Sequence, residues 1–408
     1  MSVIEFPQII ERGCGLDVHQ QTVVATIRGT DIDTETQTYG TFTSDLEKLT
    51  CWLQNNGVTH IAMESTGVYW KPVYAVLEPF FEILVVNARH IKNVPGHKTD
   101  KKDSEWIAKL LLSGLLKGSF VPDQATRELR VLYRHKKKLI QSRTAEKNRL
   151  QNILEDANIK LGSVLCDVFG KKGMAIIQQL AEGENDPIIL SNLAKGSLTR
   201  KKDQLQLALY GKFTSHHRFM LQLILQTINY INEVIDKVEK QIDMYLMQVN
   251  KEVTLLQTIP GVSKNIASGI LSEIGTDMGK FTSHKHLASW TGICPGNNES
   301  AGKMKSSRIT HANKYLKTTL TEGAWAVSRT KDNHLSYQYH ALATRRGAKK
   351  AAIAIGHKLL TAAYHVLRDK TDYQEPMVSE DIMLKRKEIT VERLQKRLDK
   401  LKTSASNC

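Results

Sequence analysis

Short apolar runs alternate with amphipathic stretches over the first 116 residues, a pattern typical of an α/β domain. The runs predict five strands, placed at 12–29 (two strands around a tight turn), 35–43, 58–64 and 81–87. Helices are predicted at 44–55, 68–79 and 100–116. The first helix is expected to begin with a capping box formed by Ser44 and Glu47.

Three strands in meander order, followed by alternating helices and strands, predict a ribonuclease-H-like mixed sheet. Ligands of such sheets bind at the carboxyl ends of parallel strands. Asp17 lies on the first predicted strand and Glu64 at the end of the fourth. We therefore expect these two side chains to lie side by side if their strands are neighbours.

The rest of the chain is mainly helical in pattern. Apolar residues recur at three- and four-residue spacing over 124–158 and again over 205–255, which predicts an antiparallel helical hairpin or coiled coil. The mixed segment 160–203 suggests no role. Residues 255–275 predict two helices joined by a Pro-Gly turn, either a phosphate-holding helix-hairpin-helix or an ordinary packing unit.

The chain then predicts a flexible loop rich in Gly, Ser and Asn up to about residue 310, followed by helices to about 368. The charged tail is expected to be a terminal helix for self-association or largely disordered. The fold class is thus α/β plus α. The expected parts are a ribonuclease-H-like domain at 1–123, a helical coiled-coil region at 124–254, a mainly α domain at 255–370 and a tail at 371–408.

Positive charge is concentrated in two zones. The net charge is +15; residues 124–160 hold ten Lys or Arg against four Asp or Glu, and residues 300–350 hold eleven against two. These zones account for the whole excess, which favours a nucleic-acid partner over plain solvated helix faces. The residues predicted to contact nucleic acid are Arg134, Lys136, Lys137, Lys138, Ser263, Lys264, Lys303, Lys305 and Arg308.

Other composition features indicate a cytoplasmic protein with no membrane partner. No run of eighteen apolar residues occurs, and the first residues lack a signal-peptide pattern. The five cysteines are scattered without a CxxC pair, which argues against a zinc site and against a disulfide framework.

Four acidic residues are candidate metal ligands. Asp100 and Asp103 stand three residues apart on a predicted helix, so both can point at one spot. Together with Asp17 and Glu64 they could hold one or two Mg²⁺ ions for phosphoryl transfer. Singly, each has an ordinary explanation, as a turn residue, a solvated strand end or helix-capping acids.

Ser300 is a candidate nucleophile. It lies in the predicted loop, shortly before Lys303 and Lys305, and such cations could hold the phosphate that an activated serine attacks. Most loop serines are only solvated, however, and by their surroundings alone Ser306 and Ser307 are equally plausible.

These motifs resemble the IS110 family of insertion-sequence transposases, which includes bridge-RNA-guided recombinases. The resemblance to the family's RuvC-like DEDD nuclease domain rests on GLDVHQ, AMESTGVYW and KTDKKDSEWIAKLLLSGLLKGSFVP. The resemblance to its C-terminal transposase domain rests on IPGV and LASWTGICPGNNESAGKMKSSRITHANKYLK.

The resemblance implies that Asp17, Glu64, Asp100 and Asp103 bind Mg²⁺ and that Ser300 is the nucleophile. Family members often show two serines before the glycine here, whereas this chain has Ser300-Ala301-Gly302. The family further implies excision and insertion of a mobile element in the bacterial cytosol or nucleoid, through a transient serine–DNA link.

The implied partners are double-stranded DNA at the element ends and target, a guide RNA, and further copies of the chain. In such dimers or tetramers the nuclease domain of one protomer meets the serine domain of another. Two other functions stay open: a metal-dependent, structure-specific endonuclease similar to a Holliday-junction resolvase, and a non-catalytic nucleic-acid-binding protein.

Overall fold

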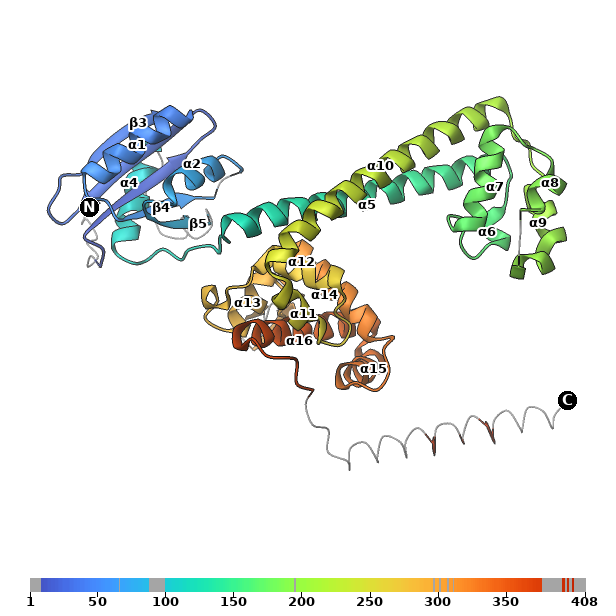
Figure 1. The fold of residues 1–408 in the computed structure, drawn as a ribbon. Coiled ribbons are helices and arrows are strands. Elements are labelled where there is room, and N and C mark those ends of the chain that lie inside the picture. The colour runs from blue at the N-terminus through green and yellow to red at the C-terminus, as the bar shows by residue number, and fades with distance from the viewer. Residues whose placement is uncertain are drawn as a thin grey trace. The chain divides into compact units, whose positions relative to one another are not determined.

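The computed structural model describes residues 9–375 except 66, 88–99, 194–195, 296–297, 301, 307 and 311, together with five positions between 391 and 399. At 100–102, 197–198, 298–300 and 304 it describes the backbone alone. The chain forms two compact units, Met1–Val121 and Pro122–Cys408 (Figure 1). No described helix has both the length and the apolar character needed to cross a membrane.

The first unit contains a five-stranded mixed sheet in the order β3-β2-β1-β4-β5. The first three strands pair antiparallel, whereas β1, β4 and β5 pair in parallel. This arrangement confirms the α/β class and is consistent with the ribonuclease-H-like sheet expected from the sequence. The strands are β1 (Arg12–Val18), β2 (Thr22–Gly29), β3 (Glu35–Gly40), β4 (His60–Glu64) and β5 (Glu82–Val86).

Helices cover both faces of this sheet. On one face, α1 and α2 pack on the apolar side chains of the strands, with Leu16, Leu49 and Ile61 fully buried. On the other face, α4 packs against β4 through a small separate cluster around Ala62 and Ile107. The helices are α1 (Thr43–Asn55), α2 (Trp70–Leu77) and α4 (Asp100–Leu112).

Two long helices of the second unit, α5 and α10, lie side by side and run antiparallel (Figure 1). Lys136 Nζ lies 2.8 Å from Glu239 Oε1, and Arg143 Nη1 donates to Asn232 Oδ1 over 2.8 Å, so residue numbers rise on one helix as they fall on the other. The predicted helical hairpin is present, while its supercoiling stays a prediction. The helices are α5 (Gln124–Asp156) and α10 (Ser215–Gln248).

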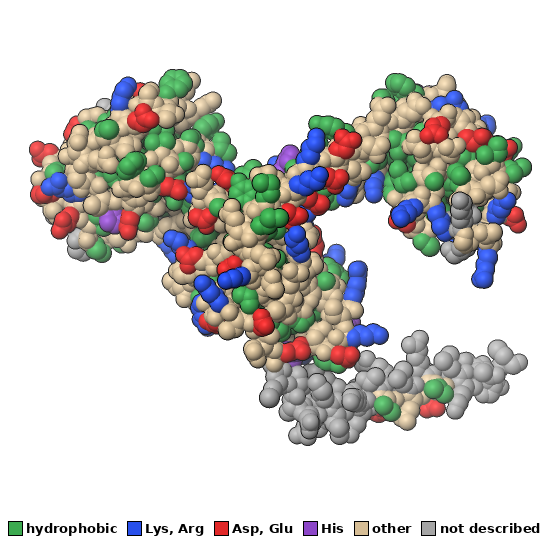
Figure 2. All heavy atoms as spheres, in the orientation of Figure 1, with side chains coloured by type: hydrophobic (Ala, Val, Ile, Leu, Met, Phe, Trp, Pro, Cys, Tyr) green, Lys and Arg blue, Asp and Glu red, His purple; other side chains and the backbone are tan. Residues whose placement is uncertain are grey.

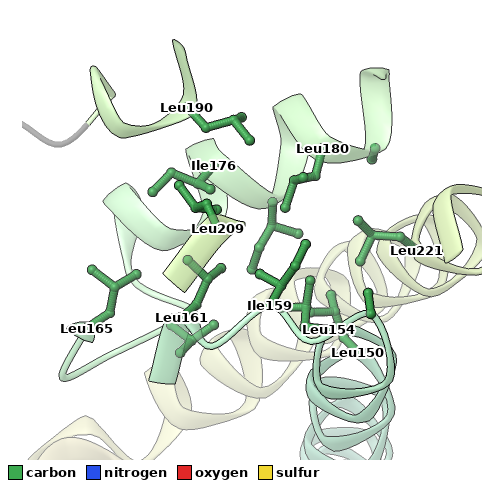
Figure 3. Close-up of a cluster of buried hydrophobic side chains, with 14 of the residues drawn as sticks. Leu150, Leu154, Ile159, Leu161, Leu165, Ile176, Leu180, Leu190, Leu209 and Leu221 are labelled. Atoms are coloured by element: carbon green, nitrogen blue, oxygen red, sulfur yellow. The ribbon is translucent and has the colours of Figure 1, made fainter. Parts of the chain in front are cut away.

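The segment between these helices forms a small helical lobe. Its core lies where the end of α5 meets the start of α10, with Leu150, Leu180 and Leu221 pointing into one apolar cluster (Figure 3). The lobe contains α6 (Leu161–Val164), α7 (Lys171–Glu182), α8 (Pro187–Ser191) and α9 (Lys202–Leu209).

The C-terminal part of the second unit packs further helices around α12 and carries one short hairpin. The turn between α11 and α12 lies against α14, because a Cβ at Gly261 would be 2.5 Å from Val327 Cγ2. The elements are α11 (Asn250–Gln257), α12 (Lys264–Ile274), α13 (His284–Thr291), β6 (Asn298–Ser300), β7 (Lys303–Ser306), α14 (Lys314–Val327), α15 (His334–Arg346) and α16 (Ala348–Asp369).

Three local predictions were wrong. The capping box at Ser44 is absent, because α1 begins after Phe42 without any side-chain cap. The helical stretch 205–255 is broken into α9, α10 and α11; Gly211 lies between the first two, where a Cβ would be 2.3 Å from the Ala157 carbonyl oxygen. The predicted loop before residue 310 contains the β6–β7 hairpin. Most of the tail 372–408 lies outside the described residues.

Candidate active site

Gly15 allows α4 to lie directly on β1. A Cβ at position 15 would be 2.1 Å from the carbonyl oxygen of Ser104 and 2.4 Å from the amide nitrogen of Ala108. At Gly13, earlier on the strand, the nearest atom belongs to Leu111. The helix therefore runs antiparallel to β1, and its first turns lie toward the carboxyl end of the strand.

Asp17 and Glu64 occupy that same end of the sheet. The parallel register of β1 with β4, continued by one residue, sets Asp17 opposite Glu64. Residues two apart on a strand share a face, so Asp17 lies on the face of Gly15 and Glu64 on the face of Ala62. That is the face covered by α4.

The first turns of α4 are anchored beside these residues. Ser104 is fully buried, and its hydroxyl hydrogen-bonds that of Thr26 on β2 at 2.7 Å. Asp103, the preceding residue, is half-buried. Asp100 is the first residue of the helix, and its side chain lies outside the described part.

His19 is a further candidate site residue, which the sequence analysis did not single out. Its Nε2 lies 3.1 Å from Asp17 Oδ2, and the Asp17 side chain is only 14% exposed. The Asp-x-His spacing, with the histidine directly after the last residue of β1, is the signal that could have identified it.

Asp17 and Glu64 place two carboxylates opposite each other at one end of the sheet, and carboxylate oxygens are ligands that a hard divalent cation such as Mg²⁺ prefers. Among the described side chains, no group of three or more His, Cys, Asp or Glu is placed to hold a metal ion. The assignment of Asp17, Glu64, Asp100 and Asp103 as metal ligands stays a prediction.

Ser300 lies at the tip of the β6–β7 hairpin. Its direct cross-strand partner is Lys303, and Gly302 between them has φ +72°, a left-handed conformation that glycine adopts without strain. Lys305 and Arg308 follow along the second strand and beyond it, and both are exposed. Three cations, Lys303, Lys305 and Arg308, thus follow Ser300 closely in the sequence.

A buried carboxylate anchors the segment that follows this hairpin. Glu273 on α12 is fully buried, and its two oxygens accept hydrogen bonds from Nε and Nη2 of Arg134 at 2.7 Å each. Asn313, the N-cap of α14, donates to the same carboxylate over 2.7 Å. Arg130 also faces Glu273, and burial lowers the pKa of Arg130 to about 10. This cluster joins α5, α12 and α14.

Several cations predicted to contact nucleic acid have partners within the chain. Lys136 pairs with Glu239, and Lys137 Nζ lies 2.7 Å from Glu322 Oε2. Along α5 and α10, Lys and Arg side chains are accordingly interspersed with Asp and Glu (Figure 2). Lys138 is exposed.

At the turn before α12, Lys264 pairs with Asp243 at 2.7 Å, and the Ser263 hydroxyl caps the helix. Phosphate contacts by Arg134, Lys136, Lys137 and Lys264 stay predictions; each would have to leave an ion pair to reach a phosphate.

Comparison with protein families decides the identity. A transposase family of the DEDD, IS110 type matches residues 14–159. A second, described as "Transposase IS116/IS110/IS902 family", matches residues 253–340. The chain belongs to the IS110 family of transposases. The first match includes all four predicted acidic ligands of this transposase, and the second includes Ser300.

Two relatives extend the likeness over most of the chain. This transposase is 24% identical over 354 residues to a pilin gene-inverting protein of Moraxella bovis. The alignment covers 82% of this chain and 90% of the relative. A protein of the same name from Moraxella lacunata matches with the same identity and coverage. These findings place the chain among DNA-processing enzymes.

Proposed function

We propose that this transposase excises and inserts a mobile DNA element by serine attack on phosphodiester bonds, assisted by Mg²⁺. The observation that supports the acidic half of the site most directly is the register of β1 with β4. It brings Asp17 opposite Glu64 on the face covered by α4. The position of Ser300 at the tip of a cationic hairpin supports the nucleophilic half.

In the proposed reaction the Ser300 hydroxyl loses its proton and its oxygen attacks the scissile phosphorus. A serine–phosphate bond forms, the bond from phosphorus to the 3′ oxygen breaks, and that oxygen takes up a proton and leaves as a 3′ hydroxyl. Attack by a 3′ hydroxyl of another strand reverses the step and reseals the DNA. Mg²⁺ bound by Asp17, Glu64, Asp100 and Asp103 would polarise the phosphate and stabilise the developing charge. Lys303 and Lys305 would hold the phosphate near the serine.

A suicide DNA substrate tests this chemistry. A nick close to the scissile bond releases a short fragment after cleavage and traps the protein–DNA adduct, which a denaturing gel detects. We expect an adduct with the wild type and with Ser306→Ala, a matched serine change on the same hairpin, but none with Ser300→Ala. Asp17→Ala should also form none while it still binds DNA.

The same experiment separates the two alternatives. Cleavage that persists without any adduct, including in Ser300→Ala, would identify a metal-dependent nuclease that uses water. If neither Asp17→Ala nor Asp103→Ala changes the recombination activity of the protein, the chain is instead a non-catalytic nucleic-acid-binding protein.

We also propose that a guide RNA and double-stranded DNA are the partners and that the active form is a homo-oligomer. Sequencing the RNA that copurifies with the full chain tests the guide. A discrete species encoded beside the gene is the expected result, and recovery of bulk cellular RNA alone would contradict it.

A further inference from the structure

Besides the cations of the serine hairpin, the chain carries a basic surface on its C-terminal helices. Much of this surface lies outside the two segments that match the transposase families. A groove of about 1280 Å³ lies between the base of the serine hairpin and the first half of α16. Its volume exceeds the range of about 300–1,000 Å³ typical of small-molecule sites. An occupant longer than a single small ligand is therefore indicated.

The rim of the groove is cationic. Arg346, Lys349 and Lys350 lie around the corner between α15 and α16, Lys358 lies further along α16, and Arg308 lies opposite on the hairpin side. All five side chains are exposed. None of them makes an ion pair with another described residue, unlike Lys136 and Lys137 of α5. Five like charges around one hollow repel each other, and a bound polyanion removes that repulsion.

The floor of the groove is apolar. Ile293, Ile309, Ile353 and Ala354 line it without being exposed, together with the half-buried ring of His357 and the exposed Pro295. Burial lowers the pKa of His357, which favours the neutral form of its ring. A duplex presents phosphates and sugars on its outside, whereas an unpaired strand also offers apolar base faces. The combination of cationic rim and apolar floor therefore fits an unpaired strand better than a closed duplex.

The groove is continuous with the hairpin that carries Ser300. Pro295 and Ile309 form the antiparallel bridge at the base of that hairpin, and both line the groove. Ser300 lies five residues beyond Pro295 in the sequence, a separation of at most about 17 Å for any path of the chain. A strand lying in the groove would thus lead toward the serine within a few nucleotides.

We propose that this groove binds an unpaired DNA strand adjoining the bond that Ser300 cleaves. Arg308, Arg346, Lys349, Lys350 and Lys358 hold its phosphates, and Ile353 with its apolar neighbours holds its base faces. The inference rests on the proposed function in one respect, the choice of DNA as the strand that reaches Ser300.

Binding measurements on the full chain test the groove. The probes are a fluorescent single-stranded DNA of mixed sequence, the same DNA as a duplex, and the same sequence as RNA, each titrated at several salt concentrations. The groove variant combines Arg346→Ala, Lys349→Ala and Lys350→Ala. The control variant combines Lys251→Ala, Arg329→Ala and Lys331→Ala, which removes the same charge from exposed positions outside the groove.

The groove variant is expected to bind single-stranded DNA at least tenfold more weakly at physiological salt. Its slope of log affinity against log salt should fall by about two, because each lost phosphate contact to a single strand contributes about 0.7. The control variant should stay within twofold of the wild type. Ile353→Ala should reduce the ratio of single-strand affinity to duplex affinity at least threefold. It should not change the slope of log affinity against log salt.

Equal weakening by the groove and control variants would overturn the proposal, as would equal loss of duplex and single-strand binding or a loss confined to RNA. The suicide-substrate assay separates this inference from the proposed function. If the groove variant loses single-strand binding while the wild type forms no adduct, the serine chemistry is wrong and the groove stands. If the adduct forms and the groove variant binds normally, the groove proposal is wrong and the serine chemistry stands.

Discussion

A single residue, Gly15, determines how closely α4 approaches β1. A side chain larger than hydrogen at position 15 would collide with the backbone of α4, so Gly15 sets the separation of helix and strand. That separation in turn sets how far Asp103 lies from Asp17 and Glu64. The spacing of the proposed ligands thus depends on a residue that carries no chemistry itself.

Gly15→Ala is expected to displace α4 from β1. A Cβ 2.1 Å from a backbone oxygen requires the helix to move, because no flexible side chain can yield. The cost is at least about 2 kcal/mol, in the upper part of the range for overpacking. Hydrogen exchange of the full chain should show roughly thirtyfold weaker protection of the α4 amides.

Gly13→Ala is the matched control on the same strand and face. There the nearest atom is Leu111 Cδ2 at 3.1 Å, the end of a side chain that can rotate. Similar loss of α4 protection in both variants would show that Gly15 has no special role in placing the helix.

At the scale of elements, the sequence predicts strands and helices that a local pattern of apolar residues determines. It misses contacts that depend on residues far apart in the sequence. The strands carrying Asp17 and Glu64 were found because apolar periodicity and β-branched residues mark them. The β6–β7 hairpin was missed because Gly, Ser and Asn predict a loop equally well. The partner of Arg134 was also missed, because Glu273 is 139 residues away in sequence and charge alone suggests solvent or nucleic acid.

The cluster around Glu273 holds three helices together. Glu273→Gln should destabilise the second unit by about 3 kcal/mol, because it leaves buried Arg130 and paired Arg134 without a compensating charge. Thermal unfolding of the full chain, followed by hydrogen exchange at α12 and α14, measures this effect. Lowered protection at the α14 N-terminus is expected as well, since Asn313 loses a charged acceptor.

Glu322→Gln provides the comparison at a surface ion pair. The Glu322 side chain is 44% exposed in its pair with Lys137, and such pairs contribute at most about 1 kcal/mol. If Glu273→Gln costs no more than Glu322→Gln, the buried cluster does not stabilise the helix junction.

At the scale of the whole molecule, the predicted acidic ligands and Ser300 belong to different compact units. A reaction that needs both can use the acidic ligands and the serine of one chain, or the acidic ligands of one protomer and the serine of another. We propose that each active site combines two protomers, and mixing two inactive variants distinguishes the two arrangements. Consider a dimer of one Asp17→Ala chain and one Ser300→Ala chain. If each site combines two protomers, one site carries both changes and the other site is intact. If each site is built from a single chain, every site carries one of the changes.

The mixed sample should therefore recover adduct formation on the suicide substrate. Random exchange of protomers between two dimers makes about a quarter of all sites intact, so adduct yield should approach a quarter of the wild-type value. Each variant alone should give none. Mixing must be done under conditions where protomers exchange, checked by exchange of two fluorescent labels. Exchange without any recovered adduct would show that each chain joins its own two units, because only that arrangement inactivates every site.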